Sequence, residues 1–160
     1  MATFGAKLTE TYTSVNGNTP GAGFAPGDIY RDESGKKYKF VQYDTGAGAV
    51  AAVAGNFCYY YAPGGTSAGA TTVVTSDLSD SAGVGAGVLM SAPADSEYCW
   101  IQISGPATLT TALSAGNDGN ALTAVGATDG TLDVSALVSD HIAAIAVDAT
   151  AKIVFVTCPE

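Results

Sequence analysis

Short apolar segments separated by turn-forming residues follow one another along most of the chain, about ten residues apart. Their β-branched and aromatic side chains favour strands, whereas the Gly, Asn, Asp and Pro residues between them favour tight turns. The pattern predicts a mainly β fold, a small antiparallel β-barrel or sandwich. The expected strands cover residues 29–32, 37–43, 57–61, 71–75, 87–90, 97–104, 107–113, 121–125, 131–134 and 153–157.

The residues before these strands have a different character. Residues 1–28 are rich in turn chemistry and show little apolar periodicity, so we expect an extended N-terminal arm that is too polar to pack as a core. Residues 29–160 are then the β domain. At most one or two short helices are expected in it, at the Ala-rich residues 47–54 or at residues 141–147, where helical and alternating spacing fit almost equally well.

The charges are few and unevenly distributed. Ten carboxylates and no Lys or Arg lie between Val41 and Ala151, and only 13% of all residues are charged, about half the ~25% of ordinary soluble domains. A net charge of −9 argues against nucleic acid as a partner, because phosphate binding needs clustered cations. A sparsely charged surface of small residues suits lasting contact with other proteins, and an Ala-rich core suggests burial between chains.

Other features bear on the compartment. The N-terminus lacks the apolar region of a signal peptide, and charged residues interrupt the most apolar stretch, Leu137–Val156, so no span of about 20 apolar residues is available to cross a membrane. Three cysteines without paired spacing are expected to be reduced thiols that pack as small hydrophobic residues in a cytosol.

No motif in the chain predicts catalysis, a cofactor or a metal. Gly46–Ala51 matches a dinucleotide-binding pattern, but the second strand and acid of that unit are missing. The single His141 has no nucleophile motif around any cysteine, and the closest Asp pairs do not fit a calcium loop. The prediction is therefore a protein that is not an enzyme, with no catalytic, cofactor-binding or metal-binding residues and no cofactor.

The aromatic residues leave two interpretations open. Tyr59–Tyr61 and the neighbouring aromatic positions would make cross-strand pairs inside a sheet, or a surface on which sugars stack. Trp100 lies between apolar neighbours in an expected strand and is predicted to be a core anchor.

Three strings of residues carry a family resemblance: Tyr38–Tyr43 (YKFVQY), Tyr98–Ala107 (YCWIQISGPA) and Ala127–Asp133 (ATDGTLD). With them the chain resembles the head-decoration, or cement, proteins of tailed bacteriophages, over about residues 29–155. The resemblance implies a non-enzymatic structural protein of the virion, made in the bacterial host cytoplasm. It would bind the outer capsid surface as a homotrimer and cement neighbouring major capsid protein subunits.

The capsid contact is expected at the arm and the first hairpin, because five of the six cations lie before residue 40. The candidates are Lys7, Arg31, Lys36, Lys37 and Lys39. The alternative is a carbohydrate- or receptor-binding β module of a phage tail or fibre. Neither interpretation involves nucleic acid or a membrane.

Overall fold

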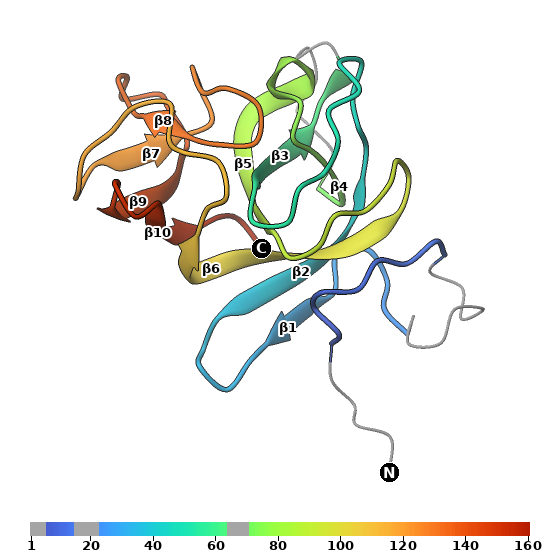
Figure 1. Ribbon diagram of the computed structural model, residues 1–160. Helices are drawn as coiled ribbons and strands as arrows, with labels where there is room; N and C mark the ends of the chain where they lie inside the picture. Colours follow the sequence, from blue (N-terminus) through green and yellow to red (C-terminus); the bar gives the residue numbers. More distant parts are fainter. Residues whose placement is uncertain (1–5, 15–22, 64–70) are drawn as a thin grey trace.

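Five strands close into a barrel because β2 pairs with β4 on one side and with β6 on the other (Figure 1). The computed structural model describes residues 6–14, 23–63 and 71–160. Around the barrel the order is β2-β4-β3-β5-β6, and β1 extends β2 at its free edge. The strands are β1 (Ile29–Arg31), β2 (Lys37–Tyr43), β3 (Phe57–Tyr61), β4 (Val73–Thr75), β5 (Ser81–Leu89), β6 (Tyr98–Thr108), β7 (Ala121–Thr123), β8 (Asp133–Val134), β9 (Ile142–Asp148) and β10 (Ile153–Thr157).

Strand β6 belongs to two parts of the molecule. Residues 98–104 pair with β2, whereas residues 104–108 pair with β10. Strand β10 is followed in the sheet by β9, β7 and β8, which form a second lobe beside the barrel (Figure 1). The long strand β6 is therefore the element that joins the two lobes.

The mainly β prediction is confirmed, and so are the first hairpin and strands β3 and β10. The antiparallel prediction is wrong for one pair, since β4 runs parallel to β2. The expected strand at 107–113 is also wrong: β6 continues through Pro106 to Thr108 because β10 pairs with it there. Residues 141–147 are not helical, and within the described residues the structure contains one 3₁₀ helix, η2 (Leu78–Asp80).

Glycines bring β5 unusually close to its neighbours. A Cβ atom on Gly85 would lie 2.5 Å from the Cβ of Ala143 in β9, and one on Gly87 would lie 2.5 Å from the carbonyl oxygen of Gln102 in β6. Such contacts are far below van der Waals distance, so only glycine fits at either position. Sequence propensity alone placed the start of this strand six residues too late, because glycine is a poor strand former and packing overrides that preference.

Buried side chains form three clusters. The first lies between the barrel and the second lobe and contains Phe57, Tyr59 and the alanines of β9. The second fills the barrel, with Tyr43, Cys58 and Tyr60 among its members. Alternate residues of β3 thus point into different clusters, which explains why its aromatic run is buried on both faces.

The third cluster lies on the outer face of β2 and β6, where the segment before β1 covers it. Tyr12 is 1% exposed, and Phe24 packs edge-on against Trp100 with ring centroids 4.8 Å apart. The expectation that residues 1–28 would not contribute to a core is therefore wrong for these two aromatics. The boundary drawn between an arm and a β domain at residue 28 stays a prediction, and residues 1–5 and 15–22 lie outside the described residues.

Trp100 lies in the core, and its role as an anchor stays a prediction. Its side chain is fully buried and contacts Phe40, Phe24 and Tyr30 through ring centroid distances of 4.8–6.3 Å. Removing the indole would leave a large cavity beneath the N-terminal segment.

We expect Trp100→Ala to lower the free energy of unfolding by about 3–5 kcal/mol. Because the variant lacks the only Trp, Trp fluorescence cannot follow its unfolding. Denaturant unfolding followed by circular dichroism measures the change instead. Val125→Ala, at a side chain that is 46% exposed, is the control and should cost less than about 0.5 kcal/mol. A loss below about 1 kcal/mol for Trp100→Ala would contradict its role as an anchor.

The phenols of the buried tyrosines are paired inside the protein. Tyr38 donates to Asp32 Oδ2 at 3.1 Å, Tyr43 to the Val50 carbonyl at 2.8 Å and Tyr60 to the Pro159 carbonyl at 3.2 Å. Burial raises the pKa of Tyr38 to about 12, with the Asp32 hydrogen bond adding to the effect, and burial also raises the pKa of Tyr43, Tyr59 and Tyr60. A raised folded-state pKa stabilises the fold below the unfolded pKa of about 10, and that stability is lost as the pH rises toward the folded value.

We therefore expect the free energy of unfolding to fall between about pH 10 and pH 12. Burial lowers the pKa of Lys39, which acts in the opposite direction, but one lysine opposes several tyrosines. In an alkaline titration, fewer than the eight tyrosines should ionise before unfolding, and the remaining tyrosinate absorbance should appear together with loss of the circular dichroism signal. Ionisation of all eight in the folded protein would contradict the prediction.

Candidate interaction surface

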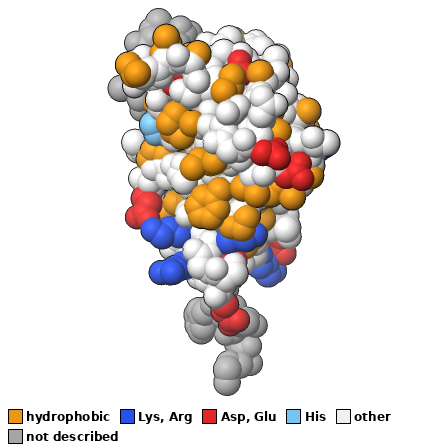
Figure 2. All heavy atoms as spheres, turned by 90° about the vertical axis from the view of Figure 1, so that its left-hand side faces the viewer, with side chains coloured by type: hydrophobic (Ala, Val, Ile, Leu, Met, Phe, Trp, Pro, Cys, Tyr) orange, Lys and Arg blue, Asp and Glu red, His pale blue; other side chains and the backbone are white. Residues whose placement is uncertain are grey.

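The exposed cations gather at the end of the molecule that carries the N-terminal segment and the first hairpin. Arg31 faces Lys37 across the β1–β2 pair, and the stem of Lys36 lies over Gly105. Lys7 is held beside the same end by the segment that contains Tyr12. In the space-filling view, Lys and Arg side chains occupy the lower part of the molecule (Figure 2). We call this surface the basic end, defined by Lys7, Arg31, Lys36 and Lys37.

Two of these cations already have a carboxylate partner. Lys7 Nζ lies 3.1 Å from Glu10 Oε1, and Lys37 contacts Glu160. Both pairs are largely exposed, so each contributes at most about 1 kcal/mol. A carboxylate of a partner protein could replace Glu10 or Glu160 at little cost in free energy, so both lysines stay available for contact.

Lys39 does not belong to this surface, although the sequence suggested a capsid contact there. Its side chain is buried, with Nζ 3.0 Å from the Tyr60 hydroxyl and 5.0 Å from the centre of that ring. Because β2 is covered on both faces, alternation does not expose this position as it would in an edge strand. The prediction that Lys39 contacts a partner is corrected on that ground.

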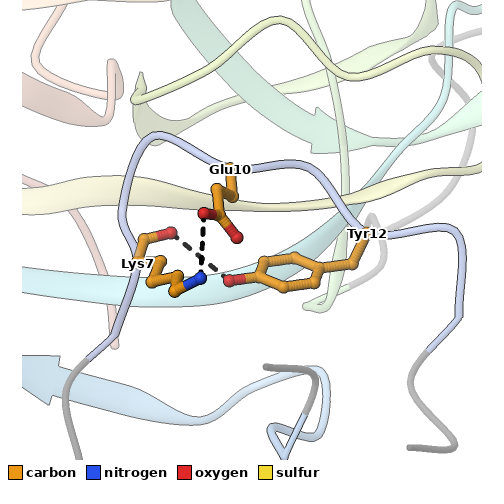
Figure 3. Close-up of polar contacts among 3 residues, drawn as sticks. All are labelled: Lys7, Glu10 and Tyr12. Carbon is orange, nitrogen blue, oxygen red and sulfur yellow. Dashed lines mark hydrogen bonds and ion pairs between the residues drawn. The ribbon is translucent and has the colours of Figure 1, made fainter. Parts of the chain in front are cut away.

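The N-terminal segment is fixed to the barrel by backbone and side-chain bonds. Tyr12 and Tyr98 exchange two backbone hydrogen bonds of 2.9 and 2.8 Å, which adds a short bridge to the start of β6. Figure 3 shows the turn that precedes the bridge: the Tyr12 hydroxyl points to the Lys7 carbonyl at 3.5 Å, and Lys7 reaches Glu10. This segment presents its charges on an ordered backbone.

A row of exposed apolar side chains crosses the second lobe. Phe155 in β10 is paired in register with Pro106 in β6 on one side and with Ile145 in β9 on the other, and Ile145 faces Ala121 in β7. All four are exposed, Ile145 by 43% and Phe155 by 44%, and Val147 adds to the row. Figure 2 shows hydrophobic side chains gathered in the middle of this face, above the basic end. Contiguous apolar surface of this kind marks contact with another molecule.

A groove adjoins the Pro106 end of the row. Its volume is about 540 Å³. The walls are mostly apolar and come from β5, β6, β10 and the loop before β3, with one cation at the rim. They include Ala54, Val88, Met90, Ala107, Ile153 and Lys36.

The opposite end of the row leads to a projecting loop. The Ser135 N–H donates to the Ala121 carbonyl, so the chain leaves the sheet beside the last residue of the row. Leu137 is 63% exposed and Val138 is fully exposed. Asp140 Oδ2 accepts from the N–H groups of Ala136 and Leu137, at 3.0 and 2.9 Å, which fixes the loop. We call residues 135–140 the knob.

The carboxylates of the two closest Asp pairs accept hydrogen bonds from backbone N–H groups. Asp77 Oδ2 accepts from Gly48 N–H at 2.7 Å and Asp80 Oδ2 from Ala47 N–H, so the Gly46–Ala51 segment is a turn tied to η2 rather than the start of a helix. Asp129 accepts from Leu78 N–H. Among the described residues, no group of three or more His, Cys, Asp or Glu side chains is arranged to hold a metal ion.

The cysteines pack as hydrophobic residues. Cys58 and Cys99 are fully buried in the barrel, and Cys158 lies against it with its thiol donating to the Ala143 carbonyl at 3.5 Å. Burial raises the pKa of each thiol, to about 12 for Cys99, so the nucleophilic thiolate is disfavoured. His141 lies at the start of β9, half-buried.

Sequence reasoning missed the row, the groove and the knob. One signal was present: in residues 142–147 and 153–156 both positions of the strand alternation are apolar, although one face of such strands normally meets water. Pairing of β10 between β6 and β9 was needed to bring the outward residues together.

Within the described chain, no helix is long and apolar enough to cross a membrane. Comparison with known proteins adds no relative. No family model matches the chain, no curated protein matches its sequence significantly, and no solved structure matches its fold significantly.

Proposed function

We propose that the protein is a non-enzymatic structural component of a phage virion that binds the outer capsid surface and cements neighbouring major capsid protein subunits. It would do so as a homotrimer on the virion, after synthesis in the bacterial host cytoplasm. The observation that carries the proposal is the uneven placement of cations: the basic end holds Lys7, Arg31, Lys36 and Lys37, while ten carboxylates and no Lys or Arg lie between Val41 and Ala151. The motif resemblance of strands β2 and β6 supports the same function.

The basic end suits an extended protein surface better than a small ligand. Lys7 lies on the N-terminal segment, and Arg31 and Lys37 lie on the β1–β2 hairpin, away from the groove that Lys36 borders. Among the described strands β1 pairs with β2 alone, so it adds an edge strand beside these cations. Charged contacts and strand addition together are common means of docking one protein on another.

The alternative, a sugar- or receptor-binding module, depended on an aromatic surface. Five of the seven rings that would form it are buried and only two are half-buried, so they offer no continuous stacking surface. The buried rings are Tyr38, Tyr43, Tyr59, Tyr60 and Trp100, and the half-buried ones are Tyr61 and Tyr98. We do not carry this alternative further.

Point substitutions test the proposal better than removal of residues 2–27, because that deletion would also strip Tyr12 and Phe24 from Trp100. Lys7→Gln with Arg31→Gln should weaken binding to capsids assembled without the protein about tenfold at low salt. Two lost charged contacts of about 0.5–1 kcal/mol each account for that factor. Co-sedimentation with the capsids measures it.

The matched control is Thr150→Glu with Ala151→Glu, at two exposed residues of the β9–β10 turn. Each double variant changes the formal net charge by two, from −9 to −11. Nonspecific electrostatic repulsion between the protein and the capsid is therefore the same for both variants. Equal binding by the two variants would contradict docking through the basic end, and failure of the wild type to bind capsids would contradict the function.

A further inference from the structure

The knob and the groove lie at opposite ends of one row and cannot meet within a chain. The row crosses β6, β10, β9 and β7, and three strand spacings amount to roughly 15 Å. The knob begins beyond β7, at Ser135. Each molecule therefore presents an apolar projection on one side and an apolar hollow on the other.

The two ends are complementary in shape and in polarity. Leu137 and Val138 project from a loop that Asp140 holds in place, so they lose little freedom on contact. The groove offers them apolar side chains that are at least partly exposed, among them Ala54, Met90 and Ile153.

Their charges are complementary as well. The knob end carries Asp133 and Asp140, and the N–H of Leu137 holds the pKa of Asp140 below its ordinary value. Lys36 lines the groove, and Lys152 Nζ bonds the carbonyl of Thr110, whose N–H bonds groove residue Gly55. A knob flanked by two carboxylates and an apolar groove bordered by Lys36 on the same chain fit a second copy of that chain better than they fit an unrelated partner.

We propose that the knob of one copy packs into the groove of the next, in a head-to-tail contact that closes a ring of three chains. The two surfaces differ, so the contact is heterologous, and heterologous contacts form rings when their rotation closes. The count of three rests on the proposed function, whereas the contact rests on the knob and groove. Phe155 and Pro106 beside the groove would be covered in the ring.

Sedimentation equilibrium of the full chain tests the contact without any capsid. We expect the wild type to reach the mass of three chains. Leu137→Ser with Val138→Ser removes the knob, and Ala54→Trp fills the groove from an exposed position. Each should weaken association at least about thirtyfold, as expected for loss of the central contact of an interface. Val125→Ser is the control at an equally apolar exposed side chain, and it should associate like the wild type.

Mixing the two defective variants is the decisive measurement. The knob-less chain keeps its groove and the groove-filled chain keeps its knob, so the mixture should form complexes of two chains and stop there. Unchanged circular dichroism of each variant shows that folding is intact.

A wild type that remains a single chain or stops at two, variants that associate normally, or a mixture that stays monomeric would each overturn the ring. Capsid co-sedimentation of the wild type separates the two proposals. A wild type that stays a single chain and still binds capsids disproves only the ring, and one that associates but does not bind capsids disproves only the function.

Discussion

Strand β6 is the element on which the rest of the structure depends, because it pairs with three strands along its length. Its first half closes the barrel against β2 and contacts β5, and its second half begins the other lobe by pairing with β10. Trp100 on this strand anchors the N-terminal segment, while Pro106 begins the apolar row. Both candidate surfaces are thus placed by the same eleven-residue strand.

Small residues determine how the two lobes fit together. Gly85 lets β5 approach Ala143, and the neighbouring alanines of β9 leave room for the rings of Phe57 and Tyr59 in the same cluster. The interface between barrel and lobe therefore combines close backbone approach with the burial of large side chains. The larger aliphatic and aromatic residues of β9 and β10 point outward instead, where Ile145 and Phe155 remain exposed. The exposed apolar surface therefore lies on the strand β9 whose inward positions are alanines.

The sequence predicted local structure better than it predicted surfaces. The hairpin of residues 29–43 was recognisable because its alternation and its polar turn act within a few residues. Burial of Lys39 was not, because it depends on strands far along the chain that cover both faces of β2. Docking of Tyr12 was missed for a similar reason: a single aromatic in a polar segment has no periodicity to reveal its partner Tyr98. To predict the row across four strands, one must know the register of β10 with β6 and β9, and no local sequence pattern encodes it.

Uneven placement of charge also gives the molecule an electric dipole. Residues 1–40 carry five cations and four carboxylates, whereas the stretch from Val41 to Ala151 carries ten carboxylates and no Lys or Arg. In the field of an anionic surface such a molecule turns before it touches, so that approach with the N-terminal segment foremost is favoured within about a Debye length of the surface. Orientation is then settled during diffusion, and fewer encounters are lost to unproductive collisions. Raising the salt concentration shortens the range of this steering while leaving the packing of the folded chain unaffected.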